Sequence, residues 1–334
     1  MPHAQLMPTF PFIQVDAFTS VAFAGNPAAV MLMPASGTDD ALLQKIAAEN
    51  NLSETCYVQP ISSDAGDAVE VGERFGLRWF TPTCEVDLCG HGTLATAAAL
   101  FTVAANPARA ITFATRSGDL VARRDSESED DAGRRRIWLD FPANPPIELE
   151  RDAGFAEFGD LIRAALSGLL GEENSAEELV ARIAYSAATR KLIVLLRATG
   201  EASLALLRPD TGALRATHDG SRVRGVAITA EAADATEFDF YSRYFAPWNG
   251  IPEDPVTGSL HTVLAPFWAA TFEARTGGGD GGRRAPTMSL CARQCSPRGG
   301  TLRLKLPAER PISSEQRVQI GGDAVCVIRG TMEV

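Results

Sequence analysis

The sequence predicts two similar domains of strands and helices, and two observations support this. The chain has 334 residues, a length that is more than one hydrophobic core usually serves. Its hydrophobic content of 45% is ample for more than one core. Residues 78–82 read Arg-Trp-Phe-Thr-Pro, and residues 243–247 read Arg-Tyr-Phe-Ala-Pro. Seven residues after each final proline stand Cys89 and Asp254, and a glycine-containing turn and an apolar segment follow each of them. A chance match of two short motifs is the alternative.

The first half alternates strand and helix patterns. Residues 39–51 carry apolar side chains at Leu42, Leu43, Ile46 and Ala47, the spacing of an amphipathic helix. Residues 92–102 are rich in alanine and follow a glycine pair, so we expect a buried helix. Glycine and proline predict a turn at 23–27. Strands are expected at 12–15, 28–32, 56–58, 77–80, 111–115, 120–123 and 137–141, with a charged, solvated loop at 125–136.

The second half has the same character. A proline-rich connection at 142–146 predicts the boundary between a first domain, residues 1–145 completed by the C-terminal strand 318–334, and a second domain, residues 146–317. A turn is expected at Gly321-Gly322, and a mobile Gly/Arg-rich loop at 275–286. Helices are expected near 155–170 and after Gly258, and strands at 191–196, 225–230, 302–306 and 324–328.

Charge and composition exclude several classes of partner. The formal net charge of -11 repels nucleic acid and anionic membranes, so we expect neither as a partner. No apolar run reaches the ~18 residues of a membrane-spanning helix. The six cysteines do not form a disulfide framework. We therefore expect a cytoplasmic protein with reduced thiols, and, because no histidine or cysteine spacing fits a metal site, no metal.

The repeat suggests where a ligand binds. If the two copies face one cleft, Cys89 and Asp254 lie opposite each other, each beside a helix N-terminus. Helix N-termini attract carboxylates through exposed N–H groups and the positive end of the helix dipole. The pattern therefore predicts a site for a small anionic substrate that bears a carboxylate.

Several segments together resemble a known family. They are Asp-Ala-Phe at 16–18, Gly-Asn-Pro-Ala-Ala-Val at 25–30, Asn-Leu-Ser-Glu-Thr at 51–55, Phe-Thr-Pro at 80–82, Leu-Cys-Gly-His-Gly-Thr-Leu-Ala at 88–95, Asp-Phe-Pro at 140–142 and Glu-Asp-Pro-Val-Thr-Gly-Ser at 253–259. In this order they resemble the phenazine-biosynthesis-like (PhzF-like) family. The resemblance implies an α+β diaminopimelate-epimerase fold, with two similar pseudo-symmetric domains, each a curved mixed sheet wrapped around a central helix. It also implies a homodimer without a cofactor, and a site between the domains.

The resemblance also implies roles for particular residues. Glu54 matches the acid/base glutamate of the family, Gly90 and His91 match site residues of the first domain, and Asp254 matches the aspartate of the second. Ser259 matches the family's hydroxyl near the substrate. Gly258 and Ser259 end the second glycine turn, at 256–259, and we expect them, with Gly90, to hold the substrate anion. Asn26 is either a substrate contact or the start of a local turn. Residues 294–300 read Gln-Cys-Ser-Pro-Arg-Gly-Gly, which departs from the phenazine enzymes and resembles a branch whose substrates are mostly unassigned.

We therefore predict a cofactor-independent isomerase that moves a proton on a small carboxylate-bearing substrate. Glu54 shuttles the proton, and we expect burial to raise the pKa of its carboxyl group so that it can both take and return a proton. His91 and Asp254 orient and polarise the substrate. One alternative is a two-base epimerase or racemase that uses Cys89 and Asp254, and another is a small-molecule-binding protein without turnover. Structural roles are the alternatives for single residues: capping or an ion pair for Glu54, and a buried apolar contact for Cys89.

Overall fold

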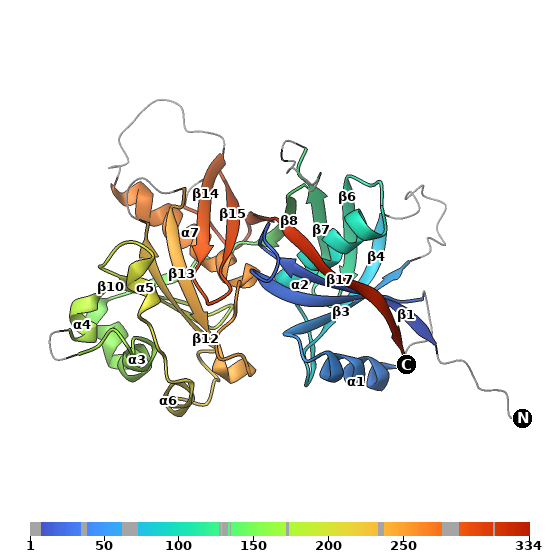
Figure 1. Ribbon diagram of the computed structural model, residues 1–334. Coiled ribbons are helices and arrows are strands. Elements are labelled where there is room, and N and C mark those ends of the chain that lie inside the picture. Colours follow the sequence, from blue (N-terminus) through green and yellow to red (C-terminus); the bar gives the residue numbers. More distant parts are fainter. Residues whose placement is uncertain are drawn as a thin grey trace, which may run out of the picture. The chain divides into compact units, whose positions relative to one another are not determined.

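The computed structural model describes residues 8–34, 39–61, 73–126, 128, 133, 135–171, 174–232, 237–275, 287–309 and 311–334 (Figure 1). They form two compact units. Unit 1 is Met1–Asp140 with Gly321–Val334, and unit 2 is Phe141–Ile320. The expected domain limits lie close to these unit limits, and that each unit is a folding domain stays a prediction.

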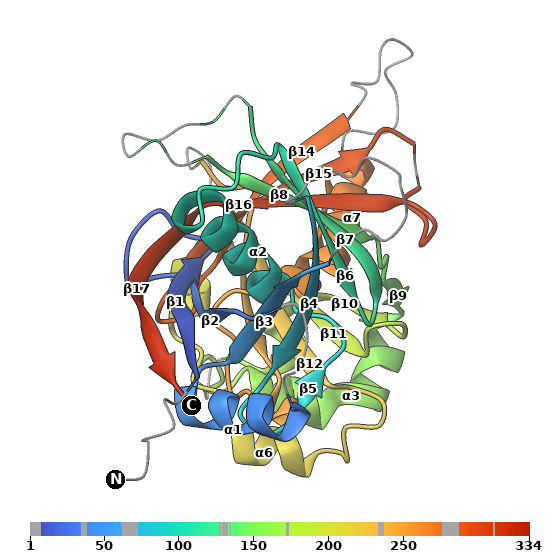
Figure 2. The ribbon, with the colours of Figure 1, turned by 90° about the vertical axis from the view of Figure 1, so that its right-hand side faces the viewer.

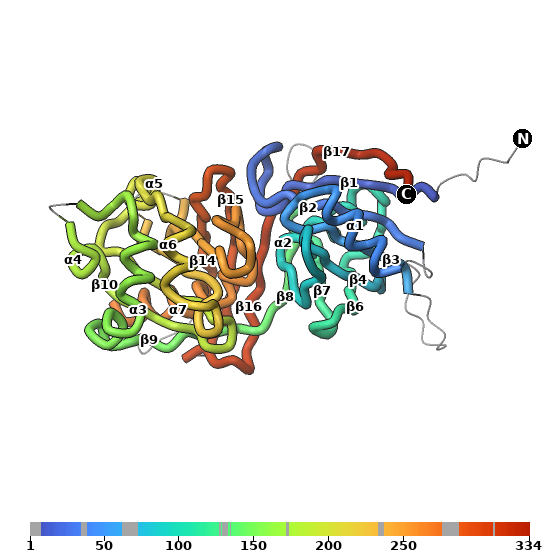
Figure 3. Tube along the Cα trace, turned by 90° about the horizontal axis from the view of Figure 1, so that it is seen from below, coloured from blue at the N-terminus to red at the C-terminus, as the bar shows by residue number. Residues whose placement is uncertain are grey.

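Unit 1 is a mixed sheet around one buried helix. Its strands pair antiparallel or parallel in the order β17–β1–β2–β3–β4–β6–β7–β8. Figure 3 shows β17, at the red end of the chain, beside the blue strand β1. The elements are β1 (Thr9–Ala17), β2 (Asn26–Leu32), α1 (Asp40–Asn50), β3 (Glu54–Pro60), β4 (Arg74–Phe80), β5 (Glu85–Val86), α2 (Gly90–Ala98), the π-helical turn η1 (Ala99–Val103), β6 (Ala110–Thr115), β7 (Gly118–Arg124), β8 (Ile137–Pro142) and β17 (Ala324–Glu333).

Helix α2 is the centre of unit 1. All nine of its residues are buried, and it packs against β1, β2, β3, β7 and β17. Figure 2 shows these curved strands enclosing the helix. Glycine, alanine and threonine predominate in α2, so the backbone of the helix fits inside the curve of the sheet. The start of the helix, rather than its side, is therefore the part that presents polar groups.

Unit 2 repeats this plan with its own core. Helix α7 is largely buried, and a second apolar cluster lies under α3, where Phe158, Ile162, Val194 and Phe245 pack together. The elements are β9 (Ile147–Leu149), α3 (Arg151–Ala165), α4 (Ala176–Leu179), β10 (Val180–Ser186), β11 (Lys191–Leu196), α5 (Ala202–Ala205), α6 (Thr211–Ala216), β12 (Gly225–Glu231), β13 (Phe240–Phe245), the 3-10 turn η2 (Pro247–Asn249), α7 (Gly258–Arg275), β14 (Thr287–Gln294), β15 (Gly300–Pro307) and β16 (Arg317–Gly322), whose last two residues belong to unit 1.

The order of strand pairing is the same in both units. In unit 1 the pairs β1–β2, β2–β3, β3–β4, β4–β6 and β6–β7 are antiparallel, parallel, antiparallel, parallel and antiparallel. The pairs β10–β11, β11–β12, β12–β13, β13–β14 and β14–β15 of unit 2 follow the same sequence. Helix α2 follows β4 just as α7 follows β13. The repeated motif at 78–82 and 243–247 therefore marks a duplicated fold, and the predicted fold class is confirmed.

The repeated arginines make matching contacts. Arg78 donates two hydrogen bonds to Glu85, at 2.8 and 2.7 Å, and its guanidinium lies 5.1 Å from the centre of the Phe80 ring. Arg243 donates two hydrogen bonds of 2.7 Å to Glu253 and lies 5.2 Å from the Phe245 ring centre. Because an arginine fork binds a carboxylate in a fixed plane, each pair fixes the loop that leads to a central helix.

The expected turn at Gly321-Gly322 is wrong, because both glycines belong to strand β16. A Cβ atom at position 321 would stand 2.7 Å from the ring of Trp138, and one at position 322 would stand 2.4 Å from the ring of Phe18. The two glycines thus allow aromatic rings to approach the strand backbone. The expected loop at 275–286 lies almost entirely outside the described residues, as does part of the loop at 125–136.

Candidate functional site

Glu54 begins strand β3, directly after the C-terminus of α1. Asn51, at that C-terminus, adopts a left-handed conformation with φ of 48°, which turns the chain sharply. Ser53 and Glu54 follow the turn, and the parallel register of β2 and β3 places Glu54 beside Ala28. The Glu54 residue is only 7% exposed. A carboxylate this deeply buried needs a polar or charged partner.

His91 is that partner. It is the second residue of α2, and its Nε2 atom lies 2.9 Å from Glu54 Oε2. The same nitrogen lies 3.2 Å from Ser53 Oγ, and Nδ1 lies 3.5 Å from Cys89 Sγ. The contact with Glu54 is an ion pair by distance, but it leaves Oε2 without an aligned hydrogen-bond donor among the described residues. Glu54 and His91, which come from separate motifs of the sequence, therefore lie next to each other.

Asn26 and Ser53 form a hydrogen-bonded chain that leads to the His91 ring of the Glu54–His91 pair. Asn26 is fully buried, and its Oδ1 accepts a hydrogen bond of 3.3 Å from Ser53 Oγ, which also lies 3.1 Å from the carbonyl oxygen of Pro27. A hydroxyl group that donates its single proton to one of these oxygens keeps lone pairs to accept from the His91 Nε2–H. Asn26 thus acts through Ser53 on the His91 ring.

Cys89 caps the helix that carries His91. Its Sγ accepts a hydrogen bond of 3.3 Å from the amide of Gly92, and the carbonyl oxygen of Cys89 accepts from Thr93. Gly90, the first residue of α2, has an amide that no carbonyl of its own helix can satisfy. The start of α2 thus places the Cys89 thiol and the His91 imidazole within 4.8 Å of the Glu54 carboxylate.

The pKa of Glu54 does not follow the sequence expectation of a raised value. Burial pushes the pKa upward, but the charge of His91 and polar contacts with His91 and Ser53 together outweigh burial, so the pKa lies below its ordinary value. The prediction foresaw the buried position but not the histidine 2.9 Å away. Glu54 therefore rests as a carboxylate, the form that accepts a proton.

Asp254 of unit 2 has the same position in the repeated motif as Cys89 of unit 1, seven residues after the final proline. Its backbone amide donates to the carbonyl oxygen of Tyr244, and its Oδ2 accepts a hydrogen bond of 2.5 Å from Thr257 Oγ1. Gln294 Nε2 donates to the carbonyl oxygen of Asp254 at 2.6 Å, and Gln294 Oε1 accepts from the amide of Thr257. Gly258 and Ser259 then begin α7. Asp254, Gly258 and Ser259 are thus brought together, in unit 2.

The counterpart of Glu54 in unit 2 carries no carboxylate. Strand register places Lys191 beside Gly225 as it places Ala28 beside Glu54, so Gly225 is the counterpart of Glu54. A Cβ atom at position 225 would stand only 2.0 Å from the Tyr244 hydroxyl oxygen, so glycine leaves room for this side chain. Burial lowers the pKa of the Lys191 amine to about 8, against the opposing effect of the negative charge of Asp254. Unit 2 therefore has an amine, a phenol and an aspartate where unit 1 has a glutamate and a histidine.

Comparison with known proteins identifies the family. A family model described as phenazine biosynthesis-like protein matches residues 15–330. This chain belongs to the phenazine biosynthesis-like family. It is 42% identical to mouse phenazine biosynthesis-like domain-containing protein 1 over 326 residues, which cover 96% of this chain and 98% of the mouse protein. It is 39% identical to an uncharacterized isomerase of Pseudomonas aeruginosa over 325 residues, covering 97% and 98% of the two chains.

Solved structures agree with this assignment to the phenazine biosynthesis-like family. A PhzF-family protein of Enterococcus faecalis has 32% sequence identity and a TM-score of 0.73, with 98% of this chain and 100% of that chain covered. A hydroxyproline epimerase of Agrobacterium vitis has 12% identity and a TM-score of 0.54, covering 98% and 93% of the two chains, which shows a shared fold. Among the described residues, no helix is long and apolar enough to cross a membrane.

Sequence reasoning missed Ser53, beside the Glu54–His91 pair of unit 1, and three residues near Asp254 in unit 2, which are Tyr244, Lys191 and Gln294. Ser53 lies in the motif at 51–55 and Tyr244 in the repeat at 243–247, but neither residue was assigned a role. Lys191 is the single charge at the start of an apolar strand, a signal that the sequence offered. Gln294 lies forty residues after Asp254, and nothing in the sequence links the two.

Sequence spacing also missed a group of possible metal ligands. Glu54, Cys89 and His91 offer a carboxylate oxygen, a thiol sulfur and a ring nitrogen within 4.8 Å of one another. These are ligand types that zinc accepts. The group escaped a search for local spacing because Glu54 comes from a distant strand. In the structure these atoms face one another as an ion pair and a helix cap, and the absence of a resident metal stays a prediction.

The contact between Glu54 and His91 predicts a change on titration. In His91→Asn, the side chain stays polar but loses its positive charge, so burial dominates and the pKa of Glu54 should rise. Because the pKa of Glu54 in the wild-type fold is depressed, the stability that the Glu54–His91 pair contributes is lost as pH falls through that pKa. The variant should lack this acid-dependent loss of stability. Carboxyl carbon NMR during a pH titration measures the shift directly. An unchanged midpoint in the variant would refute the electrostatic role of His91.

Proposed function

We propose that this protein is a cofactor-independent isomerase that moves a proton on a small substrate bearing a carboxylate. The observation that carries the proposal is the buried Glu54 carboxylate, 2.9 Å from His91, with Oε2 lacking an aligned donor among the described residues. Membership of a family in which a relative carries the name isomerase supports this type of reaction. The substrate itself is unassigned.

The reaction needs one group that takes and returns the proton. Glu54 removes a proton from a carbon near the substrate carboxylate: the C–H bond breaks, an O–H bond forms on Glu54, and the electron pair delocalises toward the substrate carboxylate. The O–H proton on Glu54 exchanges with solvent water, Glu54 returns a proton to a second carbon, and the double bonds shift accordingly. No atom or electron is gained or lost, so the reaction needs no redox cofactor.

Charge balance explains why a depressed pKa is compatible with this role. At rest, the positive charge of His91 stabilises the Glu54 carboxylate. When Glu54 takes the proton, the negative charge passes to the substrate, and a positive His91 can stabilise the charge there. The Glu54 carboxyl group, now neutral, is the form that burial favours, and it is ready to give the proton back.

Asp254 of unit 2 serves the same reaction in this proposal. With Gly258 and Ser259 at the start of α7, it binds and orients the polar groups of the substrate. The hydrogen bond from Thr257 and the clamp by Gln294 hold Asp254 in one orientation. The positive charge of the nearby Lys191 offsets the negative charge of Asp254. Homodimerisation, a cytoplasmic location and a carboxylate substrate stay predictions of the family resemblance.

A two-base epimerase is the second candidate. It is favoured by the position of Cys89, whose Sγ lies 3.5 Å from His91 Nδ1 at the start of a helix. Such an enzyme needs bases on opposite faces of one carbon, and Asp254 is the partner that the repeat suggests. In the proposed isomerase, Cys89 instead caps α2 and keeps His91 in place.

Proton exchange in heavy water distinguishes these functions. The protein is incubated with a panel of cyclic and amino-acid-derived carboxylates, and NMR locates any deuterium that enters. An isomerase should place deuterium on a carbon of a product with a shifted double bond. An epimerase should replace the proton on one carbon with deuterium and invert the configuration of that carbon. A protein that only binds should exchange no carbon-bound proton, and that result would refute the proposal.

Metal independence is a separate expected result. Because Glu54 and His91 bind each other directly, prolonged dialysis against a strong chelator should leave the exchange rate of the wild-type protein unchanged within about a factor of two. Metal analysis of the protein before and after dialysis provides the control. Loss of exchange on chelation, with recovery when zinc is added, would instead make Glu54, Cys89 and His91 a metal site.

A further inference from the structure

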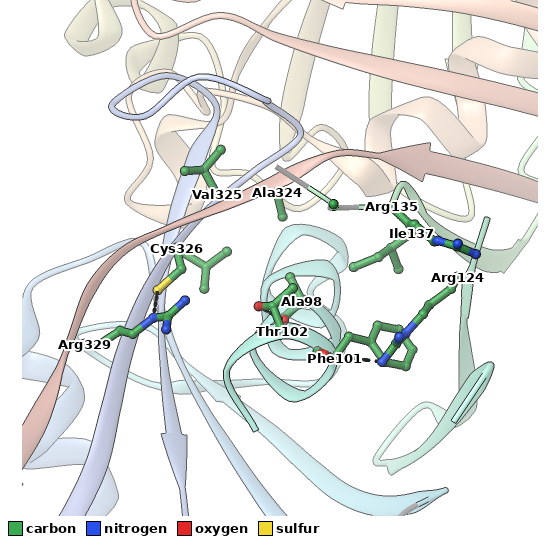
Figure 4. Close-up of a pocket in the computed structure, with 12 residues that line it drawn as sticks. Ala98, Phe101, Thr102, Arg124, Arg135, Ile137, Ala324, Val325, Cys326 and Arg329 are labelled. Atoms are coloured by element: carbon green, nitrogen blue, oxygen red, sulfur yellow. Dashed lines mark hydrogen bonds between the residues drawn. The ribbon is translucent and has the colours of Figure 1, made fainter. Parts of the chain in front are cut away.

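Lysine is rare in this chain, and one of the lysines is buried. Only three of the 31 lysine and arginine residues are lysines, and they are Lys45, Lys191 and Lys305. Arginine takes the other positions, and three arginines but no lysine line the pocket beside the last turn of helix α2 in unit 1 (Figure 4). Lys45 is exposed and Lys305 is half-buried, whereas Lys191 is only 7% exposed. A lysine amine is a compact point charge, unlike the planar fork of arginine. The one buried lysine of an arginine-rich chain therefore points to a task for a compact amine.

Lys191 lies on the face of the unit 2 sheet that packs against helix α7. It begins β11, and Gly225 of β12 is its register partner. Side chains alternate between the two faces of a sheet. Leu192 enters the apolar cluster under α3, whereas Thr229, which shares the face of Gly225, accepts a hydrogen bond of 3.1 Å from Trp268 of α7. The Lys191 side chain therefore points to the side of the sheet that carries α7.

Tyr244 and Asp254 lie at the same end of this face. A Cβ atom at position 225 would stand 2.0 Å from the Tyr244 hydroxyl oxygen, so the hydroxyl lies beside the register partner of Lys191. The Asp254 amide donates to the Tyr244 carbonyl oxygen at 3.0 Å, shortly before α7 begins. Burial raises the pKa of the Tyr244 hydroxyl and lowers the pKa of the Lys191 amine, and the negative charge of Asp254 acts on both groups. The amine, the hydroxyl and the carboxylate thus form one cluster in unit 2.

The Lys191 amine and the Tyr244 hydroxyl lack a hydrogen-bond partner among the described residues. Neither group forms a hydrogen bond or an ion pair there, although the Tyr244 residue is only 5% exposed. Asp254 acts on the amine from beyond ion-pair distance, and its own Oδ2 accepts a hydrogen bond of 2.5 Å from Thr257. A buried amine without a hydrogen-bond partner costs free energy. A ligand with negatively charged oxygen atoms would supply the partner that both groups lack.

Charge balance also favours a negative ligand beside Lys191. The proposed reaction brings a carboxylate-bearing substrate to two carboxylates of the protein, Glu54 and Asp254. Among the candidate site residues, His91 alone offers a positive charge against them. Lys191 supplies a second positive charge, which removes the excess of negative charge that would repel the substrate.

We propose that Lys191 binds the carboxylate of the substrate, with the Tyr244 hydroxyl as a second donor to the same group. A charge-assisted hydrogen bond from an amine to a carboxylate is roughly twice as strong as a neutral one. Asp254 then holds other polar groups of the substrate instead of facing its carboxylate. The identity of the ligand rests on the proposed function, whereas the binding of a carboxylate by Lys191 can be measured without turnover.

Nitrogen NMR of the lysine side chains tests the proposal on the intact protein. Three lysines give three amine signals, and Lys191→Arg identifies the signal of Lys191. The probes are benzoate and L-proline, each paired with its amide, which lacks the negative charge. Lys191 without ligand should titrate at about pH 8, and at least one of the two carboxylates should raise its midpoint by about one pH unit or more. The amides should not move it, and Lys45 and Lys305 should keep their midpoints.

Lys191→Met separates ligand binding from a structural role. Methionine keeps an unbranched side chain and removes the amine. Calorimetry should show the same carboxylate bound at least about tenfold more weakly, with a melting temperature that is not lowered, because no hydrogen bond is lost and a buried charge is removed. Lys305→Met, in β15 of the same unit, is the matched control and should leave binding unchanged. A lower melting temperature with unchanged binding would make Lys191 a structural residue and overturn the proposal.

Glu54→Gln separates the Lys191 site from the proposed reaction. This variant should lose deuterium exchange but keep the response of Lys191 to carboxylates. A response of Lys191 without exchange on any carboxylate would support the carboxylate site and reject the isomerase. Exchange on a carboxylate that leaves the Lys191 midpoint unmoved would reject the role of Lys191 alone. So would the absence of a response to both probes at millimolar concentration.

Discussion

Glu54→Gln is expected to slow deuterium exchange into the substrate by at least the ~10²–10⁴-fold typical of acid–base catalysis. Glutamine keeps the shape of glutamate and can still contact His91 and Ser53, but it cannot take a proton from carbon. Glu54 is buried and begins strand β3. Its substitution by glutamine adds no steric strain and removes one buried charge. NMR-detected exchange measures the loss, and circular dichroism checks that the variant is folded.

Cys89→Ser is the matched control for Glu54→Gln. Serine keeps an acceptor for the Gly92 amide, so the cap of α2 survives, whereas alanine would remove it at a cost of about 0.5–2 kcal/mol. If Glu54 is the shuttle, Cys89→Ser should exchange at close to the wild-type rate. The two-base epimerase predicts the reverse order. Exchange that survives Glu54→Gln and disappears in Cys89→Ser would reject the role that we assign to Glu54.

Arg243→Met should lower the free energy of unfolding by about 3–5 kcal/mol, because it breaks a buried ion pair and leaves a charge behind. The Arg243 side chain is 8% exposed and that of Glu253 is 18% exposed. Arg243 also donates to the carbonyl oxygens of Leu204 and Leu207, at 3.0 and 2.9 Å. Methionine fills a similar volume but satisfies none of these acceptors. Denaturant unfolding measures the loss.

The repeat supplies the control for Arg243→Met. Arg78 makes the same double contact with Glu85, but its side chain is 31% exposed. In addition, Arg116 lies 2.7 Å from Glu85, so that carboxylate keeps a partner when Arg78 is removed. Arg78→Met should therefore cost only about 0–1 kcal/mol, as partly exposed pairs do. Equal losses in the two variants would show that burial does not decide the difference.

The sequence predicted the fold because its two signals were local and repeated. Residues 78–82 and 243–247 each carry a strand end, and the glycine turns begin the helices that follow. The partners of the repeated arginines were not predictable. Glu85 lies seven residues after Arg78, whereas Glu253 lies ten residues after Arg243, so no common spacing marks them. Only the folded loops bring each carboxylate to the same position relative to its own arginine.

The candidate site was predicted residue by residue, but its electrostatics were not. Family resemblance placed Glu54 and His91 in one site, and the 2.9 Å contact agrees. The direction of the Glu54 pKa shift was wrong because it was inferred from burial alone, and a single neighbour reverses burial. Lys191 was missed for a similar reason: its partner Asp254 is distant in sequence.

The last strand of the chain has a consequence for biosynthesis. Strand β17 pairs with β1 along its whole length, from Thr9 opposite Glu333 to Ala17 opposite Ala324. A ribosome makes β1 first and β17 only after all of unit 2 has been made. One edge of β1 therefore waits without its final partner while unit 2, a continuous segment, can already fold. An unpaired strand edge recruits other chains, so a chain whose synthesis stops before Ala324 should aggregate through β1.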